Sequence, residues 1–376
     1  MASLRDLLRV GRKPAPAPAP AEAAPGPEAP ILAPAWVRPL FAADLAPQLR
    51  RDDGAVLVWT IEDQGSTAAI TDQFKANAEE YHRRYAHSAH FERLFRQGIE
   101  ATGITVAEAP LILDLGSGSG VNSIVPCQRI FPGARMVATD LSAELLAMLG
   151  AYAADEGAAE EVAADEGRLE GAAADAIVCV QMDAMSGLVA PGVFDLVTGA
   201  SILHHLQDPQ AGLTAAARAL KPGGHAIFFE PFNGWGIMRL GFQWILAEAA
   251  LRGEPLDPAI DTLLRATIAD IAARSDPDTD TIAFRHMDDK WLFSRAAIED
   301  MAREAGFAQA RFKPHGAHPT LYRDMGAVQL RLGTGQGDLA FPAWATAILA
   351  EVDAAFTRDA KRELMMEGTI VLTKAR

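Results

Sequence analysis

The sequence predicts an α/β protein with a doubly wound, mostly parallel sheet of seven strands. Between residues 111 and 233, short apolar segments typical of buried strands alternate with longer segments of helical periodicity. The stretch "LILDLGSGSG" (111–120) places Gly116, Gly118 and Gly120 directly after the first of these strands. Strands that alternate with helices build a parallel sheet, because each helix carries the chain back across the sheet.

The order of the expected elements follows from these patterns. A helical period between residues 70 and 100 precedes the first strand, and helices are again expected after residue 233. The last strand, "GTIVLTKA", is expected to run antiparallel as a hairpin partner at the end of the sheet. The expected strands are 111–116, 134–142, 176–184, 194–206 (a strand that passes into a turn at its end), 225–233, 307–314 and 368–375, and the expected late helices are 236–252, 257–274, 295–305 and 342–365.

The chain divides into regions of different composition. A Pro/Ala-rich tract at its start cannot bury apolar surface and is expected to be an extended tail. A helix-rich stretch after the fifth strand is expected to cover the site as a lid. The expected regions are the tail (1–30), an N-terminal extension (31–69), a ligand-binding core (70–234), the helical lid (235–294) and the end of the core with an inserted helix (295–376).

Composition restricts the possible partners. The chain has 376 residues, 49% hydrophobic and 22% charged, with a net charge of −15, which argues against a broad nucleic-acid surface. Cys127 and Cys179 have no partner at metal-ligand spacing, which favours reduced core thiols and a cytoplasmic protein. No apolar stretch is long enough to span a membrane. The stretch "HMDD" (286–289) offers too few convergent ligands to predict a metal site.

The glycine turn differs from the dinucleotide-binding pattern. That pattern is Gly-x-Gly-x-x-Gly and cradles a pyrophosphate, whereas here the third glycine comes one residue early. Asp114 precedes the turn, where a carboxylate would repel a pyrophosphate but suit a cationic ligand. "LDLGSGSG" resembles the first motif of class I S-adenosylmethionine-dependent methyltransferases. Segments that resemble the later motifs of this family follow in the same order: "VATDLS", "VQMDA", "FDLVTGASILHHLQDP" and "ALKPGGHAIFFEP".

The resemblance implies a Rossmann-like methyltransferase fold and S-adenosyl-L-methionine as cofactor. It implies that the Asp140 carboxylate accepts both ribose hydroxyls, a bidentate contact. It also implies that Asp183 receives the adenine amino group and that Ala184 lies against the ring. The positions expected to contact the cofactor are Asp114, Gly116, Ser117, Gly118, Gly120, Asp140, Leu141, Asp183, Ala184 and Ser201.

The methyl acceptor is expected at the carboxyl edge of the sheet. His204 and His205 follow the fourth strand, which in relatives faces the methyl group, and a histidine suits proton abstraction. His205 is the first candidate for a catalytic base and His204 the second. Glu230, at the end of the fifth strand, is expected either to orient substrate or to bond a neighbouring loop. Apolar side chains of the lid are expected to line the acceptor pocket, namely Trp235, Met238, Phe242 and Trp244.

The sequence therefore predicts a methyltransferase that acts on oxygen, nitrogen or carbon of a moderately hydrophobic small molecule. Two alternatives stay open: a methyltransferase for protein side chains, and a cofactor-binding scaffold without turnover. Nucleic acid is not expected as a partner.

Overall fold

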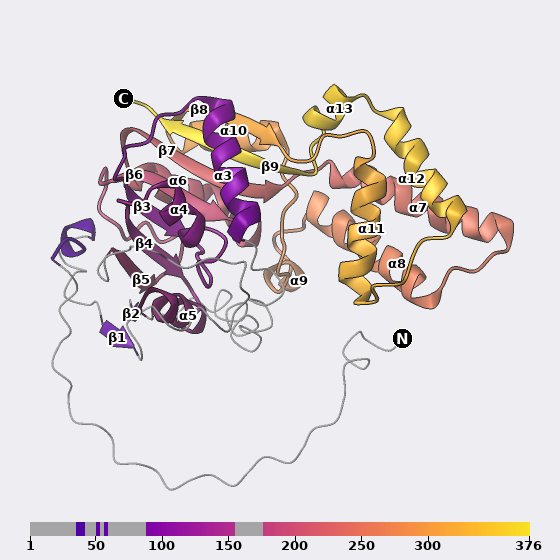
Figure 1. Cartoon of the computed structure of the whole chain (residues 1–376), viewed down its shortest axis with the longest axis horizontal. Helices are drawn as coiled ribbons and strands as arrows, with labels where there is room; N and C mark the ends of the chain where they lie inside the picture. The colour runs from indigo at the N-terminus through magenta and orange to yellow at the C-terminus, as the bar shows by residue number, and fades with distance from the viewer. Residues whose placement is uncertain (1–34, 42–49, 53–55, 59–87, 155–175) are drawn as a thin grey trace, which may run out of the picture. The chain divides into compact units, whose positions relative to one another are not determined.

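The computed structural model describes residues 35–41, 50–52, 56–58, 88–154 and 176–376. The strands in these ranges form one sheet in the order β1-β2-β5-β4-β3-β6-β7-β9-β8. Its main part, from β5 to β8, is the predicted seven-stranded sheet, and Figure 1 shows its strands side by side. The expected fold class is confirmed.

Parallel strands form the middle of the sheet. They are β5 (Ile177–Gln181), β4 (Arg135–Asp140), β3 (Leu111–Leu115), β6 (Phe194–Ala200) and β7 (Leu220–Pro231). The chain runs outward from β3 through β4 to β5 and then returns to the other side of β3 with β6. This reversal places a topological switch point at β3 and β6, and ligands of such sheets bind outside the carboxyl ends of the strands there.

The last two strands are antiparallel to their neighbours. β9 (Glu367–Lys374) inserts between β7 and β8 (Phe307–Pro314) and pairs antiparallel with both. The strand predicted at the chain end is therefore present and inserted between the fifth and sixth strands, while β8 occupies the edge. Because β9 is antiparallel, its first residue, Glu367, lies beside Pro231 at the carboxyl edge of the parallel strands.

Part of the N-terminal extension joins the opposite edge. β1 (Arg50–Asp52) and β2 (Val56–Val58) form a short hairpin, and β2 pairs parallel with β5. A 3-10 helix, η2 (Arg38–Leu40), follows the buried Val37, and Phe41 bridges to Val189. The helix expected from residue 70, the tail and the stretch 155–175 lie outside the described residues, except for the end of that helix.

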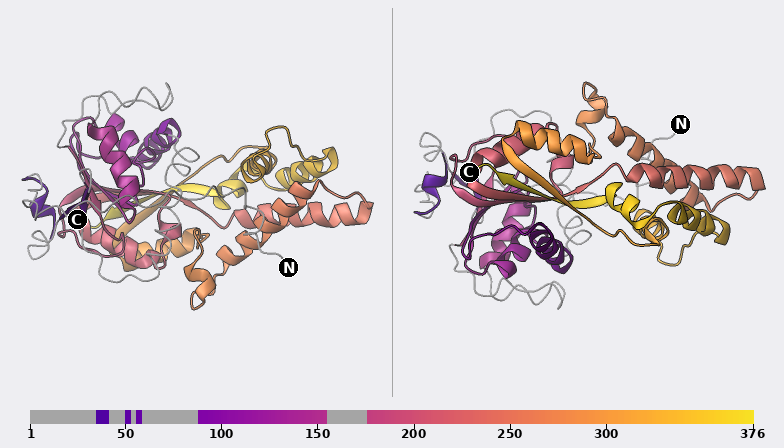
Figure 2. Two further views of the ribbon diagram at one scale, coloured as in Figure 1. Left: turned by 90° about the horizontal axis from the view of Figure 1, so that it is seen from below. Right: turned by 90° about the horizontal axis from the view of Figure 1, so that it is seen from above.

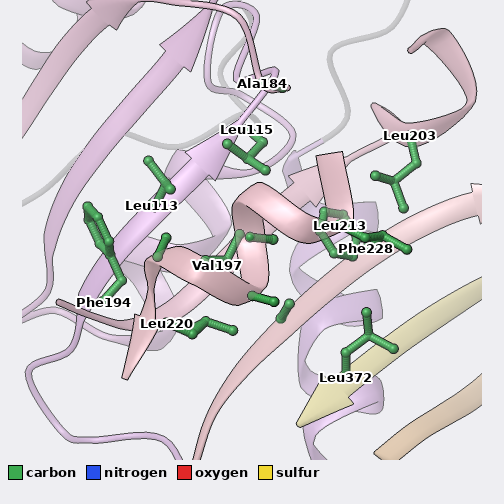
Figure 3. Close-up of a cluster of buried hydrophobic side chains, with 14 of the residues drawn as sticks. Leu113, Leu115, Ala184, Phe194, Val197, Leu203, Leu213, Leu220, Phe228 and Leu372 are labelled. Carbon is green, nitrogen blue, oxygen red and sulfur yellow. The ribbon is translucent and has the colours of Figure 1, made fainter. Parts of the chain in front are cut away.

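Helices cover both faces of the sheet, as Figure 2 shows. On one face lie α3 (Ser88–Thr102), α4 (Ile124–Ile130) and α5 (Ala143–Ala154), which pack on alternate strand residues such as Ile112 and Met136. On the other face lie α6 (Pro209–Ala219) and α10 (Arg295–Glu304). There, Leu113, Val197 and Phe228 contribute to the buried cluster drawn in Figure 3. Both predicted core thiols, Cys127 and Cys179, are buried and unpaired by disulfides.

A further set of helices has a core of its own. α7 (Trp235–Arg252), α8 (Pro258–Ser275), α11 (Leu321–Thr334) and α12 (Ala343–Ala355) bury Phe242, Leu264, Leu330 and Leu349 against one another. Figure 1 shows these helices gathered together with the short α13 (Arg358–Glu363). We refer to α7, α8 and α11–α13 as the helical part. It draws on two segments, because the stretch 321–363 packs with α7 and α8 rather than with the sheet.

Two details of this region were wrong in the sequence analysis. The helix α11 was not predicted, although Leu321 and Leu330 lie on its buried side. The helix expected at 342–365 is two helices, because Phe356 has an extended backbone and Thr357 caps the next helix by accepting from the amide of Ala360. Between α8 and α10 the chain forms only α9 (Ile282–Arg285).

Candidate functional site

The glycine turn after β3 has three residues with a left-handed backbone. The φ angles of Gly116, Gly118 and Gly120 are 65°, 55° and 76°, a region that glycine adopts without strain. A Cβ on Gly116 would lie 2.4 Å from the side chain of Ile202, and one on Gly120 would lie 2.4 Å from Leu149. At Gly118 a Cβ would meet nothing within 4 Å. Two glycines therefore permit close packing within the protein, whereas Gly118 faces open space.

Asp114 supports this turn from inside the protein. Its side chain is fully buried, and its two oxygens accept hydrogen bonds from Thr198 Oγ1 at 2.6 Å and from Ser123 Oγ at 2.5 Å. Thr198 is its register partner on β6, so the pair follows from strand alignment. Burial raises the pKa of Asp114 to about 6. Hydroxyls of the protein therefore fix the orientation of this carboxylate, and its expected contact with the cofactor stays a prediction.

Asp140, at the end of β4, joins the turn to the next loop. Its Oδ2 accepts from the amide of Gly118 at 2.8 Å, and its Oδ1 accepts from the amide of Ser142 at 2.8 Å. Burial raises the pKa of this carboxyl group. Each oxygen retains a second lone pair, so the carboxylate is fixed in orientation and still has acceptor capacity.

The other predicted cofactor positions lie along the same edge. Asp183 is buried after β5 and accepts from the amide of Met185 at 2.8 Å, and burial raises its pKa. Ala184 is buried beside it. The hydroxyl of Ser117 accepts from the amide of Thr139 at 3.0 Å and is used within the turn. The carbonyl of Leu141 accepts from the side-chain amide of Gln181 at 2.7 Å.

Ser201, directly after β6, has an unusual backbone. Among the described residues it is the one non-glycine residue with a positive φ, at 65°. Its amide donates to the carbonyl of Phe229 at 3.1 Å, which ties this conformation to β7. Such outliers persist where the surroundings enforce them, and they cluster at binding sites. The positive φ turns the chain into the 3-10 helix η5 (Leu203–His205), which carries the two histidines.

Glu230 holds that helix from the end of β7. Its carboxylate accepts from the amides of Ile202, Leu203 and His204 at 3.1, 2.8 and 3.2 Å. It also lies 2.6 Å from His204 Nδ1. Of the two expectations for Glu230, the structure therefore shows the bond to a neighbouring loop.

His204 is held between two carboxylates. Its Nδ1 faces Glu230, and its Nε2 lies 3.4 Å from Asp289 Oδ1. Burial alone would lower the pKa of His204, but the charge of Glu230 and the hydrogen bonds with Asp289 and Glu230 raise it to about 9. An imidazole with an acceptor at both nitrogens carries both protons. His204 is thus cationic near neutral pH and cannot accept a proton there.

His205 has the opposite character. Its Nδ1 lies 2.9 Å from the carbonyl oxygen of Asp288, and a carbonyl oxygen can only accept. We therefore assign the proton to Nδ1 and the lone pair to Nε2. Burial and the charge of His204, whose ring centroid is 4.0 Å away, lower the pKa of His205 to about 3. His205 is the neutral member of the pair.

Asp289 and Arg274 were missed by the sequence analysis. Asp289 Oδ2 lies 3.2 Å from Arg274 Nη1, and Arg274 comes from the last turn of α8. The stretch "HMDD" was the only signal for Asp289, and nothing in the local pattern singles out Arg274. In the part of the chain that the structure describes, His204, His205 and Asp289 also form the one group of potential metal ligands, with atoms within 4.8 Å of one another.

Most of the lid residues expected to line an apolar acceptor pocket have other surroundings in the structure. Met238 and Phe242 are fully buried in the core of the helical part, and Trp244 is 43% exposed on the surface of α7. Trp235 is buried and donates from its indole nitrogen to Glu367 Oε1 at 3.0 Å. Helical periodicity shows which side chains share a face, but not whether that face meets a ligand, another helix or water.

The fold and the glycine turn are those of class I S-adenosylmethionine-dependent methyltransferases. A family model described as "Methyltransferase domain" matches residues 79–310. Since this is more than half of the chain, the chain belongs to this family of methyltransferase domains.

Curated relatives resemble only part of the chain. An uncharacterized protein of Synechococcus is 35% identical over 150 residues, which are 39% of this chain and 32% of that protein. Ubiquinone biosynthesis O-methyltransferase of Pectobacterium carotovorum is 28% identical over 139 residues, which are 36% of this chain and 50% of the relative. The chain thus spans half or less of the length of these relatives.

The structure of this chain was also compared with solved methyltransferase structures. Phosphoethanolamine N-methyltransferase 2 of Haemonchus contortus, in complex with phosphomonomethylethanolamine and S-adenosylhomocysteine, has a TM-score of 0.47 at 13% identity. That match covers 84% of this chain and 61% of the other. A geranyl diphosphate methyltransferase has a TM-score of 0.43 at 13% identity, with 77% of each chain covered.

None of the described helices has the length and apolar character needed to cross a membrane.

Proposed function

We propose that this enzyme transfers a methyl group to a hydroxyl oxygen of a small organic acceptor placed beside His205. The observation that carries the proposal is the split of the histidine pair into a cationic His204 and a neutral His205 whose lone pair lies on Nε2. A methyltransferase needs such a lone pair only where the acceptor must lose a proton, as a hydroxyl does. The name of the relatives, ubiquinone biosynthesis O-methyltransferase, supports an oxygen acceptor.

The residues at the glycine turn fit the cofactor. Gly118 has open space where a side chain would otherwise lie, and Asp140 is fixed beside it with acceptor capacity suited to a ribose diol. Asp183 and Ala184, which follow β5 at the same edge of the sheet, are proposed to hold the adenine ring. Gly116, Gly120, Ser117 and Asp114 shape the turn, and Leu141 and Ser201 flank it. When bound, S-adenosylmethionine supplies a methyl group activated by a positively charged sulfur.

The protein residues then orient the acceptor and receive its proton. His205 Nε2 accepts a hydrogen bond from the acceptor hydroxyl, which directs an oxygen lone pair toward the methyl group. Transfer of the methyl group to this oxygen would break the methyl–sulfur bond and release S-adenosylhomocysteine, while the hydroxyl proton passes to Nε2. Because the pKa of His205 is about 3, the neutral imidazole is a weak base, and the proton transfer becomes less unfavourable as the acceptor hydroxyl becomes more acidic. The proposed acceptor class is therefore a phenol or an enol rather than an aliphatic alcohol.

The location and the alternatives follow from these arguments. Two buried cysteines without a disulfide support the proposal of a cytoplasmic enzyme. A protein side chain as acceptor is the second candidate. It is less favoured because the site lies at a sheet edge next to the helical part, which suits a small molecule better than an extended chain.

Isotope transfer tests the proposal. Purified enzyme is incubated with methyl-labelled S-adenosylmethionine and matched panels of phenols, enols, aliphatic alcohols and amines, and wild type is compared with His205→Gln. Turnover of phenols or enols, reduced at least about a hundredfold in the variant with unchanged cofactor affinity, is the expected result. His286→Gln is the matched control, because His286 is exposed outside the histidine pair. Exclusive turnover of amines, or a variant with wild-type activity, contradicts the proposal.

A further inference from the structure

The 3-10 helix η5 and the following Leu206 together form what we call the histidine turn. A segment between α9 and α10 holds this turn in place through hydrogen bonds. We call Met287–Trp291 the strap. Its Lys290 amide donates to the carbonyl of His204 at 2.8 Å, and its Trp291 indole donates to the carbonyl of Leu206 at 2.8 Å. The carbonyl of Asp288 receives His205 Nδ1. Three strap residues therefore bond three residues of the histidine turn, so a displacement of the strap would displace both imidazoles.

Asp289 is the strap residue between the two imidazoles. Its Oδ1 lies 3.4 Å from His204 Nε2 and 3.5 Å from His205 Nδ1, and its Oδ2 lies 3.2 Å from Arg274 Nη1. Burial would raise its pKa, but the hydrogen bond with His204 and the charges of the histidines and Arg274 hold that pKa well below its usual range. Asp289 is thus a permanent anion in contact with both histidines.

Arg274 connects this anion to the helical part. The residue is buried at the end of α8, a helix whose Ile260, Leu264 and Ile271 lie in the core of the helical part. Its carbonyl accepts from the amide of Leu292 at 3.0 Å, and its Nη2 donates to the carbonyl of Trp291 at 3.4 Å. Its guanidinium also lies 3.3 Å from Asp270, one turn earlier on α8. Arg274 is therefore tied at several points to both α8 and the chain around the strap.

We propose that Arg274 and Asp289 are positioning residues through which the helical part sets the orientation of the His204 and His205 imidazoles. The proposal rests on the proposed function in that His205 meets the acceptor. A proton that arrives on His205 is repelled by the cation of His204, and the Asp289 anion offsets this repulsion. Arg274 fixes the carboxylate so that Oδ1 faces the imidazoles and Oδ2 faces away.

Several charged groups act on the two imidazoles, so the test must isolate Asp289. They come from different elements: Glu230 of β7, Glu367 of β9, Asp289 and Lys290 of the strap, and Arg274 of α8. Asp289→Asn removes one charge and keeps the shape. Asp270→Asn is the matched control, because Asp270 also pairs with Arg274 but has no contact with either histidine among the described residues.

The first measurement is an NMR titration of His204 in the full-length protein. We expect Asp289→Asn to lower the pKa of His204 toward neutrality, while Asp270→Asn leaves it unchanged. The second measurement is the pH profile of turnover. Asp289→Asn and Arg274→Met are expected to reduce turnover about tenfold with unchanged cofactor affinity, and the charged Arg274→Lys to recover most of it.

An unchanged pKa of His204 in Asp289→Asn overturns the proposal, and so does equal loss of turnover in Arg274→Lys and Arg274→Met. A third overturning result is wild-type turnover that rises with added Zn²⁺ or Mn²⁺ and loses this response in Asp289→Asn, because the cluster would then be a metal site. The NMR titration needs no acceptor. It therefore separates a failure of this proposal from a failure of the proposed function, which a fully active His205→Gln would reveal.

Discussion

The glycine turn and the histidine turn occupy the same edge of one sheet, but they are built in different ways. The glycine turn is held by residues close in sequence or on adjacent strands, such as Asp114 with Ser123 and Asp140 with Gly118. The histidine turn is held by Glu230, the strap and Arg274, which come from three separate segments. The turn proposed to hold the cofactor thus depends on local contacts, whereas the turn proposed to meet the acceptor depends on contacts between segments far apart in the sequence.

The largest expected effect contrasts two glycines of the first turn. Gly116→Ala places a Cβ against Ile202 at a positive φ, so strain and overpacking together should cost about 4 kcal/mol of unfolding free energy. Gly118→Ala has the strain without the clash and should cost about 1 kcal/mol. Denaturant unfolding of both variants measures the difference. Equal destabilisation would show that Ile202, next to the histidine turn, does not press on the glycine turn.

The second prediction concerns the pH dependence that His204 confers. Its pKa is about 9 in the folded protein and about 6.5 when unfolded, so the cation stabilises the fold. The contribution, on the order of 3 kcal/mol, is fully present below pH 6.5 and is lost as the pH rises through 9. Unfolding measured from pH 6 to pH 10 should show this loss in wild type but not in His204→Gln. Parallel curves for the two proteins would refute the paired cation.

The third prediction separates the two turns functionally. Asp140→Ala removes the carboxylate fixed beside Gly118, so cofactor binding measured by calorimetry should weaken by about 2 kcal/mol. The NMR-detected pKa of His204 should stay the same, because Asp140 does not contact the histidine turn in the described structure. Asp289→Asn should show the reverse pattern. If Asp140→Ala shifted the histidine titration, the two turns would not be independent.

The smallest expected effect tests the reassignment of Trp244. Because this side chain is 43% exposed on α7, Trp244→Ser should change the unfolding free energy by less than about 0.5 kcal/mol. Turnover should also equal that of wild type. A variant that loses turnover while it keeps its melting temperature would return Trp244 to the acceptor site.

Sequence reasoning succeeded where a local pattern is tied to a local structure. The alternation of strands and helices predicted the class of the sheet and the positions of its strands, and the spacing of Gly116, Gly118 and Gly120 indicated a glycine turn after the first strand. It was less successful after residue 233. There α11 was missed, and Phe242 was predicted in a pocket although it lies in a helical core. An amphipathic pattern identifies a buried face without identifying what buries it.

The sequence by itself determined the family, the sheet and the glycine turn, because backbone angles and strand register act over a few residues or between adjacent strands. Only the tertiary structure decided that Asp114 supports the turn, since its contact with Thr198 spans 84 positions. Only the tertiary structure likewise made His204 cationic and His205 neutral. Both have nearly the same neighbours along the chain, and their pKa values diverge because Glu230, Asp289 and the Asp288 carbonyl approach them from distant segments.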